Sequence, residues 1–391
     1  MPGYELVGKE EQDSINEIFE KGRGVLVRYG FDSVRNGVYK VNEFEKKFTE
    51  YLHVKHALAV SSGNVALKVA LVALGVKPGD EVKTQSFTFV ATAEAILDIG
   101  ATPIFTEVDD TLTMDLNDLK KKITKKTKVI IPVHMYGFPC NMDAILKIAK
   151  ENKIKVLEDA AQCCGGEYKG KKLGTIGDVG IISFDFAKIV TTGEGGLVIT
   201  NNDEIAAISR EYHDHGHENN PNFPRGDDTR RRPGFTYRMN ELQGAVGIAQ
   251  LAKLDFMLKR LKENYDAIYK NIKSFENLKW VNYHDKAGQT HDSIVFFMKN
   301  IENARKAVAI LKERKVSTKN LPDAIKWHYA GTWNHMLPEF DMYKNKDLMT
   351  LWPKSTEILL RAVSIPVNIK MSKEDITRVF DAINAINKEC A

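Results

Sequence analysis

Short apolar segments alternate with helical patterns through the first two-thirds of the chain. Each apolar segment is bounded by turn residues, and helical periodicity follows most of them. Strands that alternate with helices predict a mainly parallel sheet covered by helices on both faces. The expected strands are 56–60, 81–84, 102–106, 129–133, 154–158, 179–184 and 196–200, and the expected helices are 65–74, 90–99, 142–151 and 204–212.

The pattern changes after Asp255. A long helical stretch over 241–275 leads into mixed segments near 293–298, 304–314 and 373–386, and residues 214–233 read as a long polar loop. We therefore expect three parts. They are an N-terminal arm or helix (1–30), a large α/β domain with seven strands (31–255) and a smaller C-terminal α+β domain (256–391).

Composition excludes several classes of protein. The formal net charge of the 391-residue chain is only +4, too small to favour nucleic acids or membrane surfaces. No apolar run is long enough to span a membrane and no secretory signal is evident, so we expect a cytoplasmic protein. The cysteines lack the spacing of a zinc or redox site and are expected to be free thiols. They are Cys140, Cys163, Cys164 and Cys390.

Ligands of such sheets bind outside the carboxyl ends of the strands, where three features stand out. The first is the turn 60–64, whose small residues lead into the helix expected at 65–74. Backbone N–H groups and the helix dipole at such a turn favour a phosphate. An ordinary Ser or Asn helix cap is the alternative interpretation.

The second feature is Asp159, which ends a buried strand. A carboxylate at such a place is costly to desolvate unless a cation meets it. The protonated pyridine nitrogen of a cofactor is such a cation. A helix N-cap is the alternative interpretation.

The third feature is Lys188, which follows an apolar strand and precedes a glycine-rich turn. A lysine in such surroundings can act as nucleophile and base. A solvated surface lysine is the alternative. The glycines at 193, 195 and 196 lack the spacing of a dinucleotide fingerprint.

The combination and its order resemble one family. From about Tyr39 to Asp255, the chain is similar to the DegT/DnrJ/EryC1/StrS sugar aminotransferases. The motifs that carry the resemblance are Phe44-Glu45, 54–57, Ser61-Ser62-Gly63, 88–92, 133–137, 157–162, Ser183-Phe184, Lys188, 191–196 and 237–243.

The resemblance implies a fold-type I transferase that uses pyridoxal 5'-phosphate. Lys188 would hold the cofactor as a Schiff base, Asp159 would pair with the pyridinium nitrogen, and Gln162 would meet the phenolic oxygen. Phe89 would stack on the ring. The phosphate would be held by Ser62, Gly63, Asn64 and Ser183.

Two positions depart from the family pattern. Asn64 replaces the common Thr, which keeps a backbone contact and loses a hydroxyl contact. Thr236 stands where an Asn often reaches the phosphate of the neighbouring subunit. Relatives of this fold with His in place of the lysine perform dehydration, so Lys188 favours transamination.

The family resemblance also implies the reaction and the partners. L-Glutamate would donate an amino group to a keto-sugar by a ping-pong mechanism, in a homodimer with shared active sites. Segments 27–32, 213–221 and 327–333 resemble a branch that makes 8-amino-3,8-dideoxy-manno-octulosonate for lipopolysaccharide. The expected substrate contacts are then Arg28, Tyr29, His215, Arg225 and His328, and the run 230–232 adds further arginines for an anion.

Other functions stay open at this point. A nucleotide-linked 3- or 4-keto-6-deoxy sugar is the alternative substrate. Lyase or racemase chemistry would use the same cofactor, and a sugar-binding or regulatory protein would need no lysine. A metal-dependent hydrolase is the alternative from another class, on the alternate histidines His213, His215 and His217. No second ligand cluster supports it, so we expect no metal.

Overall fold

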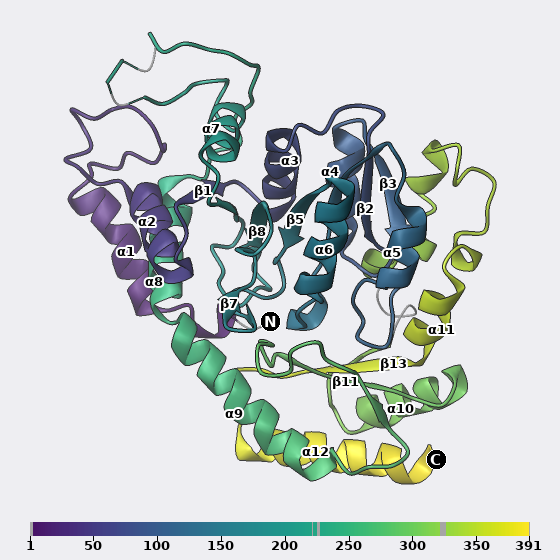
Figure 1. The fold of residues 1–391 in the computed structure, drawn as a ribbon. Helices are drawn as coiled ribbons and strands as arrows, with labels where there is room; N and C mark the ends of the chain where they lie inside the picture. The colour runs from purple at the N-terminus through teal and green to yellow at the C-terminus, as the bar shows by residue number, and fades with distance from the viewer. Residues whose placement is uncertain (1–2, 221, 225–226, 321–325, 391) are drawn as a thin grey trace.

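The computed structural model describes residues 3–220, 222–224, 227–320 and 326–390. Its centre is a seven-stranded sheet in the order β1-β9-β8-β5-β4-β2-β3 (Figure 1). The strands are β1 (His56–Val60), β2 (Glu81–Gln85), β3 (Thr102–Thr106), β4 (Thr127–Ile131), β5 (Lys155–Asp159), β8 (Val179–Ser183) and β9 (Gly196–Thr200). The predicted α/β fold with a mostly parallel sheet is confirmed.

Only β9 runs against the other six strands. It pairs antiparallel with both β1 and β8, whereas β3, β2, β4, β5 and β8 pair in parallel. Because crossovers return each parallel strand in the same direction, their carboxyl ends meet at one edge of the sheet. The crossover and flanking helices are α3 (Gly63–Ala73), α4 (Val90–Asp98), α5 (Leu116–Lys122), α6 (Met142–Asn152) and α7 (Asp203–Tyr212). A short hairpin, β6 (Glu167–Tyr168) and β7 (Lys171–Lys172), precedes β8.

Three helices pack together beside the sheet: α1 (Lys9–Glu20), α2 (Lys40–Leu52) and α8 (Glu241–Ala252). The buried rings of Phe44 and Phe48 on α2 meet Phe184, which directly follows β8. Gly247 of α8 lies so close that a Cβ there would be 2.4 Å from the Phe44 ring. Truncation of a fully buried Phe in such a cluster costs about 3–5 kcal/mol of stability. This packing anchors the start of the chain segment that carries Lys188.

A second sheet has the order β10-β11-β13-β12 and is antiparallel throughout. Its strands are β10 (Lys279–Trp280), β11 (Ser293–Phe297), β12 (Lys319–Asn320) and β13 (Ala362–Pro366), and its helices are α9 (Leu254–Ile272), α10 (Ile301–Glu313) and α12 (Lys373–Glu389). The helical stretch expected over 241–275 is two helices that meet at Lys253. The chain turns there because α8 packs on α1 and α2, whereas α9 packs on α12.

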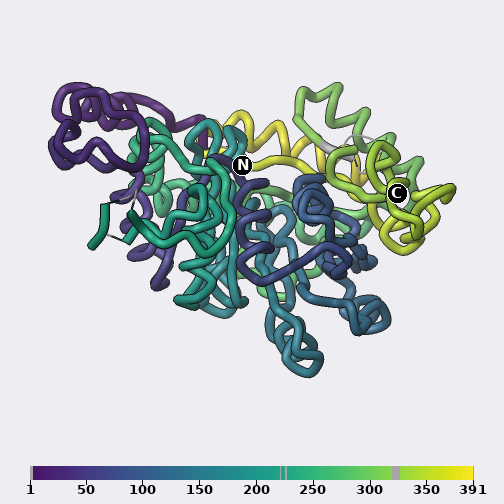
Figure 2. The backbone as a smooth tube through the Cα atoms, turned by 90° about the horizontal axis from the view of Figure 1, so that it is seen from above, coloured from purple at the N-terminus to yellow at the C-terminus, as the bar shows by residue number. Residues whose placement is uncertain are grey.

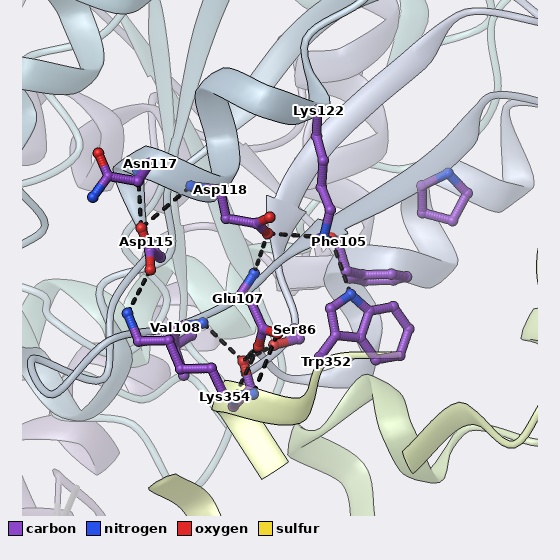
Figure 3. Close-up of polar contacts among 12 residues, drawn as sticks. Ser86, Phe105, Glu107, Val108, Asp115, Asn117, Asp118, Lys122, Trp352 and Lys354 are labelled. Atoms are coloured by element: carbon purple, nitrogen blue, oxygen red, sulfur yellow. Dashed lines mark hydrogen bonds and ion pairs between the residues drawn. The ribbon is translucent and has the colours of Figure 1, made fainter. Parts of the chain in front are cut away.

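A polar network attaches the C-terminal part of the chain, the residues that follow α9, to the carboxyl end of β3 (Figure 3). The hydroxyl of Ser355, on α11 (Pro353–Arg361), accepts hydrogen bonds from the N–H of Val108 and the hydroxyl of Ser86. That hydroxyl also donates to the Glu107 carboxylate, and Lys354 pairs with Asp115. These contacts hold α11 beside the loop that follows β2.

Two long loops project from one side of the molecule, and their described residues are 23–39 and 213–220, 222–224 and 227–238 (Figures 1 and 2). Buried ion pairs hold the first of them, Arg28 with Glu45 and Arg35 with Glu241. All four cysteines are buried and free. Within the described ranges, no helix combines the length and the apolar character needed to cross a membrane.

Candidate active site

A cavity of about 610 Å³ lies between the carboxyl ends of the large sheet and the second sheet. Each residue expected to bind the cofactor lines it: Ser62, Gly63, Asn64, Phe89, Asp159, Gln162, Ser183 and Lys188. They come from the carboxyl ends of β1, β2, β5 and β8 and from the segments that directly follow, which explains why residues so far apart in sequence meet. The opposite wall includes Ser293 and Ser364 from the second sheet and Asp292, which directly precedes β11.

The turn between β1 and α3 is built around a close backbone approach. A Cβ on Gly63 would lie 2.7 Å from the Cβ of Ser183, so only glycine brings this turn against the end of β8. The Ser62 hydroxyl caps α3 by accepting a hydrogen bond from the N–H of Val65. The Ser62 side chain therefore acts as a helix cap, as the alternative interpretation of this turn predicts. The first N–H groups of α3 have no intrahelical acceptor, which suits this turn to an anion.

Asp159 is almost fully buried at the end of β5. One carboxylate oxygen accepts a hydrogen bond from the Thr92 hydroxyl at 2.9 Å, and the other accepts one from the N–H of Ala161 at 3.1 Å. Burial raises the pKa of Asp159, and these hydrogen bonds oppose that shift only in part. The carboxylate therefore gains from any cation that enters the cavity.

The neighbouring carboxylate, Glu158, faces away from the cavity because side chains alternate along a strand. It accepts hydrogen bonds from the N–H groups of Gly174, Ile176 and Gly177, and its Oε2 lies 3.2 Å from Nε2 of His134. His134 Nδ1 accepts from the N–H of Cys140, so Nε2 carries the ring proton and donates to Glu158. No role was predicted for Glu158 from the sequence, although it is a second acidic residue in a buried strand.

Lys188 lies in the loop between β8 and β9 and is half-buried. Its N–H donates to the carbonyl of Asp185 at 2.9 Å, and the Asp185 carboxylate accepts from the N–H of Ala187. This turn presents the lysine at the cavity wall. The positive charge of Lys188 lowers the pKa of Asp159 and so opposes the effect of burial.

An aromatic pair forms another part of the wall. The rings of Phe89 and His328 lie 5.2 Å apart between centroids. The N–H of Thr88 donates to the carbonyl of His328, and Phe87 forms a β-bridge with Tyr329. The backbone of the C-terminal part is therefore joined to the loop that carries Phe89. Trp327, also in this wall, was missed as a site residue although it adjoins His328 in sequence.

Gln162 lies on the cavity wall with its amide held in place. Its Oε1 accepts a hydrogen bond from the N–H of Tyr136 at 3.1 Å. Thr92, which holds Asp159, was quoted only as part of a motif and received no role. Its distance of 67 positions from Asp159 explains why no local pattern indicated the contact.

Of the expected substrate contacts that the structure describes, only His328 lines the cavity. The Arg28 guanidinium is buried and bonded to the Glu45 carboxylate and the Ala59 carbonyl, so it is not placed as an anion contact in this chain. Tyr29 bonds to His213, and His215 bonds to Thr236. The other loop arginines pair with Glu211 and Glu218 or contact His217. Arg225 lies outside the described residues.

The three alternate histidines do not converge. His213 bonds to Tyr29 and to the Arg210 carbonyl, and His217 pairs with Asp228. In the described part of the chain, no three His, Cys, Asp or Glu side chains form a group that could hold a metal ion. The geometry gives the hydrolase alternative no support.

Comparison with known proteins places this site in a family. Residues 30–384 match the DegT/DnrJ/EryC1/StrS aminotransferase family. The GDP-perosamine synthase of Caulobacter vibrioides is 45% identical over 216 residues, which cover 54% of this chain and 56% of that protein. The GDP-perosamine synthase of Escherichia coli O157:H7 is 34% identical over 88% of this chain and 89% of its own length.

The fold is also that of solved relatives. NtdA from Bacillus subtilis, with its bound cofactor PMP, superposes with a TM-score of 0.84 at 23% identity, over 99% of this chain and 84% of that one. Fold and cavity together define a fold-type I, pyridoxal-phosphate-dependent transferase. The chain belongs to the DegT/DnrJ/EryC1/StrS aminotransferase family and is a sugar aminotransferase.

The described residues fit pyridoxal phosphate. The close approach of Gly63 to Ser183 leaves a turn of backbone donors suited to a phosphate. The buried Asp159 needs a cation, which a pyridinium nitrogen provides. Lys188 lies on the wall of the same cavity, within reach of a bound group.

The raised pKa of Asp159 predicts a trade-off between stability and cofactor binding. Ionised Asp159 destabilises the cofactor-free protein at neutral pH, and the penalty vanishes where the carboxyl is protonated in both folded and unfolded states. Cofactor-free Asp159→Asn should therefore unfold at equal or higher urea concentration than wild type at about pH 8, with a gain of up to about 1–3 kcal/mol. The gain should shrink as the pH falls toward the ordinary aspartate range.

The same variant should bind the cofactor more weakly, because Asn carries no charge to pair with the pyridinium. Exposed Asp381→Asn is the control and should change neither property. A cofactor-free Asp159→Asn protein clearly less stable than wild type at about pH 8 would contradict the argument.

Proposed function

We propose that this aminotransferase moves the amino group of L-glutamate to a keto-sugar, with Lys188 as the catalytic residue. The observation that carries the proposal is that Lys188 and Asp159 line one cavity and interact electrostatically. Only an intact lysine there can both attach the cofactor and move a proton. Lyase or racemase chemistry would use the same residues, so product analysis with labelled glutamate is part of the assignment.

Each residue has one task in this proposal. Asp159, held by Thr92 and Ala161, would pair with the protonated pyridine nitrogen, while the first turn of α3 and Ser183 would hold the phosphate. Phe89 would lie against the ring, and the amide N–H of Gln162 would meet the phenolic oxygen. The bound cofactor supplies the electron sink and carries the amino group between the two substrates.

Lys188 moves the proton in both half-reactions. Its Nζ removes the proton from the α-carbon of glutamate and, after 2-oxoglutarate has left, delivers a proton to the sugar carbon that receives the amino group. The donor product leaves before the sugar enters, so ping-pong kinetics follow.

We favour a nucleotide-linked keto-sugar as the acceptor, because GDP-perosamine synthases are among the relatives. A free 8-keto octulosonate is the second candidate, and its support is that Trp327 and His328, which belong to one of the three branch-like segments, line the cavity. Arg28, the expected carboxylate contact, is bound to Glu45 instead.

We also propose a homodimer whose partner completes the site. Among the described residues that line the cavity there is no arginine, while Glu94 and Glu194 add negative charge. The carboxylates of glutamate therefore need cations from outside this cavity wall. Sedimentation velocity should give a species of about twice the 44.1 kDa chain mass, and a monomer with full activity would refute the shared site.

Lys188→Ala should abolish turnover, by at least about 10³-fold, because it removes both the attachment point and the proton carrier. Wild-type protein should show the visible absorbance of bound pyridoxal phosphate, and glutamate should bleach it. In Lys188→Ala, glutamate should not bleach the absorbance of the bound cofactor at a rate comparable with wild type. Lys147→Ala, on the exposed face of α6, is the matched control. Substantial turnover in Lys188→Ala would overturn the assignment.

The acceptor can be identified by return of the absorbance. Protein bleached with glutamate and freed of small molecules should regain its visible band when a GDP-linked 4-keto-6-deoxy sugar is added. Recovery with an 8-keto octulosonate alone would instead establish the second candidate. Mass spectrometry of the aminated product should confirm which compound reacted.

A further inference from the structure

The N-terminal segment Gly3–Leu6, here called the strap, lies directly on the loop that carries Lys188. The N–H of Gly3 donates a hydrogen bond to the carbonyl oxygen of Lys188 itself, at 3.0 Å. The ring of Tyr4 stacks on the ring of Phe186, with centroids 5.1 Å apart and planes 18° from parallel. Both contacts reach the short turn that presents the lysine.

The contact at Gly3 leaves no room for a side chain. A Cβ on Gly3 would lie 2.1 Å from the carbonyl oxygen of Ile189 and 2.7 Å from that of Lys188. Both obstacles are backbone atoms, so a side chain there must displace either the strap or the main chain at Lys188. Gly3 is therefore required by the approach of two backbones.

The other end of the strap is fixed to a different part of the molecule. The Glu5 carboxylate accepts hydrogen bonds from the N–H groups of Ile369, at 2.9 Å, and Lys370, at 3.0 Å. The Lys253 ammonium donates to the Leu6 carbonyl and pairs with Glu11 on α1. The strap thus joins the Lys188 loop to the chain that follows β13, the strand that contributes Ser364 and Pro366 to the cavity wall.

The Lys188 loop stays partly exposed even where Tyr4 stacks on it. Phe186 is 57% exposed and Ala187 is exposed as well, so the strap is an important lateral support of this turn. A lysine side chain is long and flexible, and the position of its Nζ depends on where the main chain holds its Cα. Displacement of a reacting group by about 1 Å can cost about 10²-fold in rate.

We propose that the strap is a positioning element for Lys188, which sets the place of the reacting amine through its main chain. The proposal rests on the proposed role of Lys188, while its structural part concerns the loop alone. The strap touches the loop and not the reacting atoms, so its residues act through Lys188.

The test compares Gly3→Ala with Gly8→Ala in the holoenzyme. Gly8 belongs to the same N-terminal stretch, but a Cβ there would meet nothing closer than 3.8 Å, so the control adds the same methyl group without a clash. Hydrogen exchange of peptides covering 184–192 reports on the loop. The pH titration of the cofactor's visible absorbance reports on Lys188 Nζ, and the single-turnover rate with glutamate reports on the chemistry.

In Gly3→Ala, the backbone amides of this loop should exchange hydrogen faster than in wild type. The midpoint of the absorbance titration should shift, and the single turnover should slow by about 10²-fold. Gly8→Ala should match wild type in all three. Glu5→Ala is a second variant that removes the far anchor without adding bulk, and it should change the three measurements in the same direction by less.

Two results would overturn the proposal. One is unchanged loop exchange in both Gly3→Ala and Glu5→Ala. The other is faster loop exchange with an unchanged titration and rate, because the strap would then hold a loop whose position does not matter to Lys188. Failure of the proposed function looks different: wild type would lack the glutamate-sensitive absorbance, whereas the exchange comparison would still report on the strap.

Discussion

Burial of the Asp159 carboxylate is the constraint on which the rest of the site depends. The chain contains an internal comparison, because Glu158 is its neighbour in β5 and is equally buried. Glu158 is surrounded by three backbone N–H groups and a histidine, so its charge is satisfied within the fold. Asp159 has two hydrogen bonds and a raised pKa. The carboxylate with incomplete compensation faces the cavity, and this difference separates a binding group from a structural one.

The cavity exists because the C-terminal part is fastened to the large sheet at several points. Ser355 and Glu107 connect α11 to the end of β3, and the Phe87–Tyr329 bridge continues the contact to the loop before α4. Side chains from the second sheet can then close the side of the cavity opposite Asp159. Since the wall comes from segments far apart in sequence, the shape of the substrate space depends on the packing of the whole chain.

The cofactor side of the site could be predicted from sequence and the substrate side could not. Ser62, Asp159 and Lys188 each follow an apolar strand, so a local pattern indicates them, and parallel topology brings them together. Arg28 is different. Its guanidinium is held by the Glu45 carboxylate and the Ala59 carbonyl, and no spacing in the sequence indicates that Glu45 neutralises its charge. The same limit applies to helices: the turn at Lys253 has no glycine or proline to indicate it and follows from the packing of α8 and α9 on different neighbours.

The charge of the cavity limits what the described wall can bind. Glu94, Glu194 and Asp292 supply acceptors, and Asp292 is buried with a raised pKa because of desolvation. These side chains can accept hydrogen bonds from hydroxyl groups, and away from Lys188 and the turn between β1 and α3 they disfavour a further phosphate or carboxylate group. The wall is therefore compatible with a sugar ring that carries several hydroxyls, whereas an anionic group on the acceptor would have to lie away from Glu94 and Glu194. If the acceptor carries an anionic group, as proposed above, that group would have to reach cations other than Lys188, which lines this cavity.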